Sequence, residues 1–166
     1  MSNITFITLT SDNCGHCVKF KSTIRPSGQT GMNELLSSIR KKYPNVVIKM
    51  ANIDQTGNYN LNGIPTEFYN LSDQWYPSFY LFDSNKFNSG VMDGGLVMGG
   101  YVSGNNVVLD GTKRSTDPKI IFSWVESKLG NNTTNNVTNN NNTMINTNHY
   151  SNTPIYAQYE QRLYNM

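Results

Sequence analysis

The sequence contains two cysteines, and both belong to one tetrapeptide, Cys14-Gly15-His16-Cys17. Two thiols separated by two residues can hold half of a zinc site, form a redox-active dithiol, or be a structural pair. The thiolate is the form of cysteine that attacks disulfides and binds metals, so the surroundings of the motif decide which chemistry is favoured.

A zinc site within one chain is disfavoured because further ligands are scarce. Structural zinc takes four ligands, usually a second cysteine pair or two well-spaced histidines. The only histidines are His16, inside the motif, and His149, near the C-terminus. Zinc shared between two chains and a structural pair of buried thiols stay open. The favoured interpretation is a redox dithiol that needs neither a metal nor another cofactor.

The residues around the motif predict a strand that turns into a helix. Residues 4–10 (ITFITLT) are rich in β-branched and aromatic side chains, and residues 11–13 (SDN) are a turn signal. The apolar positions that follow have the i, i+3, i+7 spacing of one helical face: Cys17, Phe20 and Ile24. We therefore expect Cys14 at the N-terminus of a helix.

This position predicts different roles for the two cysteines. Unsatisfied N–H groups and the positive end of the helix dipole stabilise a thiolate at Cys14, and Lys19 and Lys21 add nearby positive charge. Cys17 lies one turn deeper, within reach of Cys14 but shielded. Cys14 is thus predicted to attack a disulfide, and Cys17 to resolve the mixed disulfide that forms.

Gly15 and His16, between the cysteines, are the predicted redox-tuning residues. A partial positive charge on His16 favours the Cys14 thiolate, which stabilises the reduced form and makes the disulfide a better oxidant. The alternative is a solvent-facing His16 that changes the potential only slightly.

A second helix and a parallel strand are predicted next. An apolar stripe at helical spacing marks the helix: Met32, Leu35, Leu36, Ile39 and Tyr43. Pro26 and Gly28 separate it from the first helix, so we expect a break or kink near residues 26–30. Residues 46–53 (VVIKMANI) predict a strand, which completes a β-α-β unit with parallel pairing and a right-handed crossover.

The second half of the sequence predicts strands and a final helix. Residues 55–75 are expected to be loop with at most a short helix, and residues 78–82 (SFYLF) a strand closed by a turn at 83–85. Residues 96–102 and 107–110 have the pattern of a hairpin. Asp117 and Pro118 then have the types of an N-cap and a first helical residue, and Gly130 can end that helix.

Residues 3–130 resemble the thioredoxin superfamily. The resemblance rests on the Cys14–Cys17 motif between a strand and a helix, on residues 49–54 (KMANID), on a proline that opens a strand in residues 76–79 (YPSF), and on a final helix after a hairpin. The tetrapeptide looks like that of protein disulfide isomerase domains. The resemblance implies a thioredoxin-like α/β fold, with a central mixed β-sheet flanked by helices.

The family places a cis-proline beside the dithiol, where the preceding residue offers backbone groups to a substrate chain. Pro65 and Pro77 both fit, and Pro77 is favoured because a clear strand follows it, which makes Tyr76 and Pro77 the implied substrate-binding residues. The family also carries a buried acid on its first strand. This chain departs from that pattern, since Thr8 is nearest to the register and residues 4–10 contain no acid.

The C-terminal segment, residues 131–166, has a different composition from the domain. It holds 12 of the 25 asparagines, and chains of this kind bury too little apolar area to offset the entropy of ordering. We therefore predict a domain at 1–130 and an Asn/Thr-rich disordered tail at 131–166. Its Tyr-rich end is either a frayed terminus with chance aromatics or a short motif that docks on a partner or folds back onto the domain.

Charge and hydropathy exclude several classes of protein. Thirteen Lys and Arg against eleven Asp and Glu are scattered without a basic stripe, so no nucleic-acid partner is expected. No apolar run approaches the ~18 residues of a membrane span. The start of the sequence (MSNITFITLT) lacks the features of a secretory signal, so we expect a reducing, cytoplasmic location.

The predicted function is thiol–disulfide oxidoreduction of protein substrates, with a reductase or an oxidase as recycling partner. A reducing compartment favours reduction, whereas the isomerase-like motif favours oxidation or isomerisation. The alternative is a non-enzymatic thioredoxin-like adaptor that binds partners through the domain and tail. A relic dithiol would not be expected to keep both cysteines while the chain has none elsewhere, which favours the enzyme.

Overall fold

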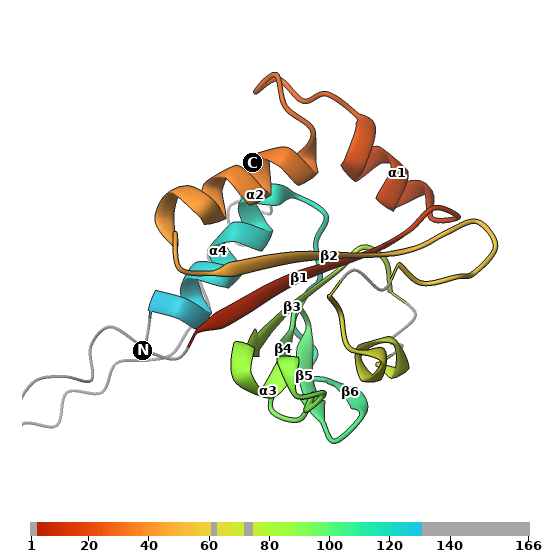
Figure 1. Ribbon diagram of the computed structural model, residues 1–166. Helices are drawn as coiled ribbons and strands as arrows, with labels where there is room; N and C mark the ends of the chain where they lie inside the picture. The colour runs from red at the N-terminus through yellow and green to blue at the C-terminus, as the bar shows by residue number, and fades with distance from the viewer. Residues whose placement is uncertain (1–2, 61–62, 72–74, 131–166) are drawn as a thin grey trace, which may run out of the picture. The chain divides into compact units, whose positions relative to one another are not determined.

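A computed structural model describes residues 3–60, 63–71 and 75–130 of the 166-residue chain. These residues form a mixed six-stranded sheet in the order β2-β1-β3-β4-β5-β6, with helices on both faces (Figure 1). The predicted disordered tail and its Tyr-rich end, 131–166, lie outside the described residues. The elements in chain order are β1 (Ile4–Ser11), α1 (Gly15–Ser22), α2 (Gly31–Lys42), β2 (Val47–Ile53), η1 (Thr66–Asn70), β3 (Ser78–Asp83), α3 (Ser84–Asn88), β4 (Leu96–Val97), β5 (Gly100–Ser103), β6 (Asn106–Leu109) and α4 (Pro118–Leu129).

Strand β1 is paired on both sides. It runs parallel to β2, with a register from Thr5 opposite Val47 to Ser11 opposite Ile53, and antiparallel to β3. The parallel β1-β2 pairing confirms the β-α-β unit expected from the sequence. Because both neighbours hold β1, the point where it ends is fixed by two ladders of backbone hydrogen bonds.

The first helix is shorter than the sequence predicts. Helix α1 ends at Ser22, and Thr23 turns to an extended conformation while its N–H bonds to the Lys19 carbonyl. Ile24, predicted on the buried helical face, is 65% exposed and pairs with Thr30 in an isolated bridge. The break between the helices therefore begins before residue 26, and Thr30 then caps α2 by accepting the Asn33 N–H.

Two further predictions from the second half are wrong in detail. The residues predicted to form a turn at 83–85 instead start helix α3, because the Asp83 carboxylate accepts the N–H groups of Asn85 and Lys86. The strand predicted at 96–102 is interrupted between β4 and β5, where Gly99 has a φ of +98°. The hairpin predicted between residues 96–102 and 107–110 is confirmed for the second part of that strand, because β5 pairs antiparallel with β6.

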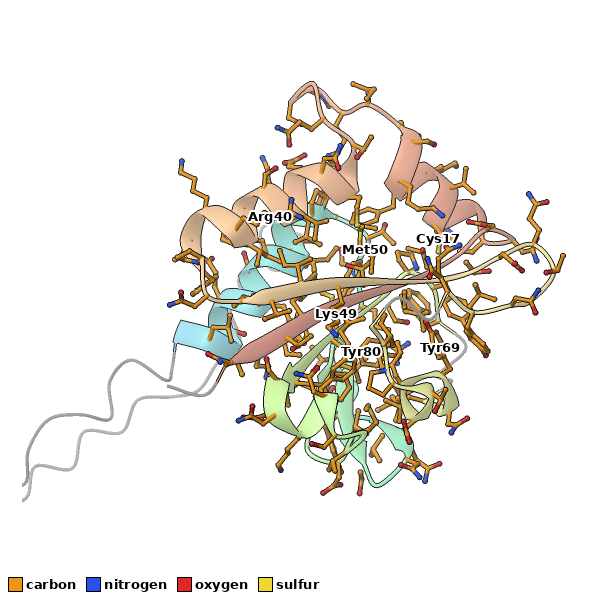
Figure 2. All side chains as sticks on the ribbon, in the orientation of Figure 1. Cys17, Arg40, Lys49, Met50, Tyr69 and Tyr80 are labelled. Carbon is orange, nitrogen blue, oxygen red and sulfur yellow. The ribbon has the colours of Figure 1, made fainter. Side chains whose placement is uncertain are left out.

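Side chains that alternate along the strands contribute to two separate hydrophobic cores, one on each face of the sheet. One face carries Ile7, Leu9 and Tyr80, against Phe68 of η1 and Phe87 of α3. The opposite face packs against α1, α2 and α4 through a second cluster: Phe6, Phe20, Leu35, Ile39, Phe79, Leu81, Ile121 and Val125. Figure 2 shows Cys17 where α1 begins and the labelled Tyr69 and Tyr80 on the other side of the sheet. None of the described helices is long and apolar enough to cross a membrane.

Phe79 packs between α1 and the sheet, and removal of its ring should lower the stability of the fold. The ring is 1% exposed, stacks on Phe6 and meets Phe20 of α1 edge-on at 5.7 Å between centroids. Phe79→Ala should lower the free energy of unfolding by about 3–5 kcal/mol, because it removes transfer free energy and leaves a cavity. Chemical denaturation measures this. Val18→Ala, at a half-exposed position of α1, is the control and should change it by less than about 0.5 kcal/mol. A loss below 1 kcal/mol for Phe79→Ala would contradict the role assigned to the ring.

Candidate functional site

Cys14 lies at the N-cap of α1, as the sequence predicts. Its backbone is extended, and its sulfur accepts the Cys17 N–H at a Sγ–N distance of 3.4 Å. The Cys14 N–H in turn bonds to the Ser11 carbonyl at 3.2 Å, and the Cys14 carbonyl accepts the Val18 N–H. The sulfur therefore replaces the side-chain oxygen of an ordinary N-cap and faces the positive end of the helix.

The segment before β3 forms the other side of the site. The Cys14 thiol donates to the Tyr76 carbonyl oxygen at 3.4 Å, although 62 residues separate the two in sequence. The Tyr76–Pro77 peptide bond is cis, so of the two prolines left open by the sequence, Pro77 is the one with this geometry. Pro65 instead lies at the N-cap of η1. The structure thus brings the predicted residues Cys14, Tyr76 and Pro77 together.

Cys17 is fully buried, and its sulfur is held against the end of β1. The Ser11 N–H donates to Cys17 Sγ at 3.4 Å. Burial raises the pKa of Cys17 to about 12; the neighbouring Cys14 also raises it, while the Ser11 N–H and the charge of Lys21 act in the opposite direction. At neutral pH, Cys17 is therefore a thiol, and its proton has to leave when the sulfur attacks.

A polar network lies between α1 and the ends of β1 and β2. Lys21 Nζ is 2.8 Å from Asp12 Oδ1 and 3.3 Å from Asn52 Oδ1, and Thr10 Oγ1 donates to the same Asn52 oxygen at 2.7 Å. The hydrogen bond from Lys21 holds the pKa of Asp12 below its ordinary value. These hydrogen bonds hold Lys21 where its charge lowers the pKa of Cys17, an effect smaller than that of burial.

Sequence analysis missed Asp12 and Asn52 as members of this network. Lys21 is four residues after Cys17 on α1, a spacing that is visible in the sequence. Asn52 reaches it only because the parallel register places Thr10 opposite Asn52. No local sequence pattern predicts the register of two paired strands with an accuracy of one residue.

Thr8 occupies the strand position where the resemblance expects an acid. The residue is fully buried, and within the described part of the chain its hydroxyl has no hydrogen-bond partner. A hydroxyl at this position does not ionise near neutral pH and so does not replace a carboxylate as a base.

Gly15 and His16 occupy the first turn of α1, on the exposed side of the dithiol. His16 is exposed and lines two hollows of the surface, one of which also contains Cys14. A Cβ added at Gly15 would meet nothing within 4 Å, so no close contact requires glycine there. Across the described residues, no three His, Cys, Asp or Glu side chains gather as metal ligands.

No protein-family model matches the chain, and no curated protein matches it in sequence.

The different surroundings of the two thiols predict selective alkylation. With a pKa of about 12, Cys17 is a thiolate in only about one molecule in 10⁴ at pH 8, and its side chain is buried as well. Iodoacetamide at pH 7–8 should modify Cys14 at least a hundredfold faster, as read by peptide mass spectrometry after timed pulses. Cys17 should become reactive in the native protein only above about pH 11, or on unfolding. The Cys14→Ser variant provides the rate at Cys17 alone. Equal labelling of the two sulfurs would contradict the roles assigned to them, and faster labelling of Cys17 would reverse these roles.

Proposed function

We propose that this chain is a thiol–disulfide oxidoreductase acting on protein disulfides, with Cys14 as nucleophile and Cys17 as resolving thiol. One observation carries the proposal: a partly exposed cysteine caps a helix, and the buried cysteine one turn deeper donates its N–H to the first sulfur at 3.4 Å. This arrangement offers a reactive sulfur to the surface and keeps its reaction partner out of solvent.

In the reducing direction, the Cys14 thiolate attacks one sulfur of the substrate disulfide. The substrate S–S bond breaks, the attacked sulfur forms a mixed disulfide with Cys14, and the other substrate sulfur leaves and takes up a proton from solvent. Cys17 then attacks Cys14 Sγ, and the substrate sulfur held in the mixed disulfide leaves as a thiol. Two electrons have moved to the substrate, and the protein holds a Cys14–Cys17 disulfide. A reductase restores the dithiol; an oxidase partner drives the opposite direction.

The second attack requires the proton of Cys17 to be removed. The departing substrate thiolate is a base formed in the same step, and it takes this proton. Lys21, held by Asp12 and Asn52, stabilises the thiolate that develops on Cys17. In this proposal Lys21 is a positioning residue of the site, and it provides part of what an acid on β1 provides in the family that the sequence resembles.

A thioredoxin-like fold is the second part of the proposal. It is supported by the element order, in which a β-α-β unit holds the dithiol after its first strand, an antiparallel strand follows Pro77, and a hairpin precedes the final helix. The segment from β3 to β4 departs from a plain hairpin by inserting α3. A reducing compartment, such as the cytoplasm, belongs to the same proposal.

Trapping of a mixed disulfide tests the assigned function. Cys17→Ser keeps the nucleophile and removes the resolving thiol, so the full-length variant incubated with an oxidised protein should form a covalent adduct through Cys14. Non-reducing electrophoresis should show the adduct, and dithiothreitol should abolish it. Cys14→Ser should give at least tenfold less adduct, and the double variant none. Failure of Cys17→Ser to form any adduct, with its fold intact by circular dichroism, would refute the proposal.

The redox potential of the Cys14–Cys17 pair is expected to be less negative than that of thioredoxin. Isomerase-type sites lie near −180 mV and thioredoxin near −270 mV, and we expect about −190 to −230 mV here. A partial positive charge on His16, in the first turn of α1, would favour the Cys14 thiolate and hence the reduced form. Titration against glutathione measures the potential. His16→Pro should lower it by tens of millivolts, and His16→Gln, which keeps the backbone free, should separate the effect of the imidazole. A wild-type value at or below about −270 mV would exclude this role of His16.

A further inference from the structure

Two hollows of the surface adjoin at the dithiol. The wider, of about 500 Å³, is lined by Cys14, Trp75, Tyr76 and Arg114. The narrower, of about 200 Å³, is lined by Lys19, Thr23 and Arg25. His16 and Thr116 line both, so the two hollows adjoin, one containing Cys14 and the other lying beside α1. We call the two hollows together the Cys14 groove.

The walls of the Cys14 groove carry cations. Lys19, Arg25 and Arg114 line it together with His16, and none of the described residues that line it is acidic. Arg25 is paired with two carboxylates outside the lining, Glu34 at 3.0 Å and Asp117 at 3.4 Å, so its charge is largely balanced. Lys19 is exposed and takes part in none of the ion pairs among the described residues.

Arg114 is seated at the groove by its neighbours. Its guanidinium lies 5.5 Å from the centre of the Trp75 ring, a cation–π distance, and that ring is 45% exposed. Its aliphatic stem runs over Gly99, where an added Cβ would come within 2.7 Å of Arg114 Cγ. The backbone at Gly99 therefore leaves room for this side chain. Arg114 presents a positioned charge beside an apolar surface, in the same hollow as the reactive sulfur.

We infer that the Cys14 groove binds an extended, acidic segment of the protein substrate next to its reacting cysteine. This inference rests on the proposed function and adds its substrate class. Carboxylates close to the substrate sulfur lie toward Arg114, and those a few residues further along lie toward Lys19. An extended chain rises about 3.3 Å per residue, so a short segment reaches from the sulfur into the second hollow. A small ligand occupies one hollow and leaves the other unused.

Rates with matched peptides test this preference. Two peptides of equal length with one internal disulfide are used, flanked by glutamates in one and by lysines in the other. The reduced full-length protein should reduce the acidic peptide about tenfold faster at low salt. The ratio should fall to within about twofold at 0.5 M NaCl, because salt screens exposed charges.

Substitution of the groove cations should remove the preference. In Lys19→Gln/Arg114→Gln, the ratio of the two rates should fall to within about twofold. The matched control is Lys41→Gln/Lys86→Gln, which makes the same change in net charge at exposed positions outside the groove and should keep the tenfold ratio. Each variant is judged by the ratio of two rates in one preparation, so partial loss of folded protein cancels.

The experiments distinguish failure of the groove inference from failure of the proposed function. If the wild type reduces hydroxyethyl disulfide, a small neutral compound, but both peptides equally fast, the groove inference is overturned and the function stands. If the protein reduces oxidised glutathione as fast as it reduces the acidic peptide, the groove inference is also overturned, in favour of a small anionic ligand. If no disulfide reacts, the proposed function fails. The preference of the Cys14 groove for an acidic segment is then tested by fluorescence anisotropy with thioether analogues of the two peptides. Tighter binding of the acidic analogue by about tenfold upholds the groove, and equal or absent binding overturns it.

Discussion

The backbone of Ser11 holds both sulfur-bearing residues, and the site depends on it. Its carbonyl accepts the Cys14 N–H at 3.2 Å, and its N–H donates to Cys17 Sγ at 3.4 Å. Ser11 is also the last residue of β1, paired with Ile53 across the parallel ladder. Because β1 is held between β2 and β3, the sheet fixes where Ser11 lies, and Ser11 fixes where α1 begins. A shift of one residue in β1 would turn its side chains to the opposite core and move both cysteines with it.

The same arrangement makes the two thiols unequal. One sulfur caps the helix and reaches the surface, whereas the other is fully buried and has a pKa of about 12. A buried thiol reacts slowly with reagents in solution, which protects Cys17 from modification. The same burial makes the thiol resist the loss of its proton. Lys21 offsets part of this resistance. The side chains of Lys21 and Asp12 remain about one-third exposed, and Asp12 and Asn52 supply Lys21 with hydrogen bonds that replace lost water.

The parts of the fold that the sequence predicted are those with local signals. The β-branched run of β1, the apolar stripe of α2 and the Asp117-Pro118 cap of α4 each specify an element within a dozen residues. The errors occurred where one residue decided the outcome. The exit of the chain from α1 at Thr23 exposes Ile24, and the carboxylate of Asp83 starts a helix in place of a turn. The contact of Cys14 with Tyr76 was expected only from the family resemblance. The contact of Arg114 with Trp75 depends on sheet order and register, which single-sequence patterns do not specify.

The division of the site between the two halves of the chain has a chemical consequence. The β1-α1 junction supplies the reacting sulfurs and the cation that acts on Cys17, and these residues are coupled through the backbone of Ser11. In the proposed function, the surface that meets a substrate comes partly from later segments, Trp75 and Tyr76 before β3 and Arg114 before α4. These segments are loops, which tolerate substitution more readily than β1 does, since β1 is buried and paired on both sides. If the proposed function holds, changes at Arg114 or Trp75 should therefore alter which disulfides reach Cys14 without disturbing the contacts between Ser11 and the two cysteines. The charge of the groove is thus a property separable from the dithiol chemistry.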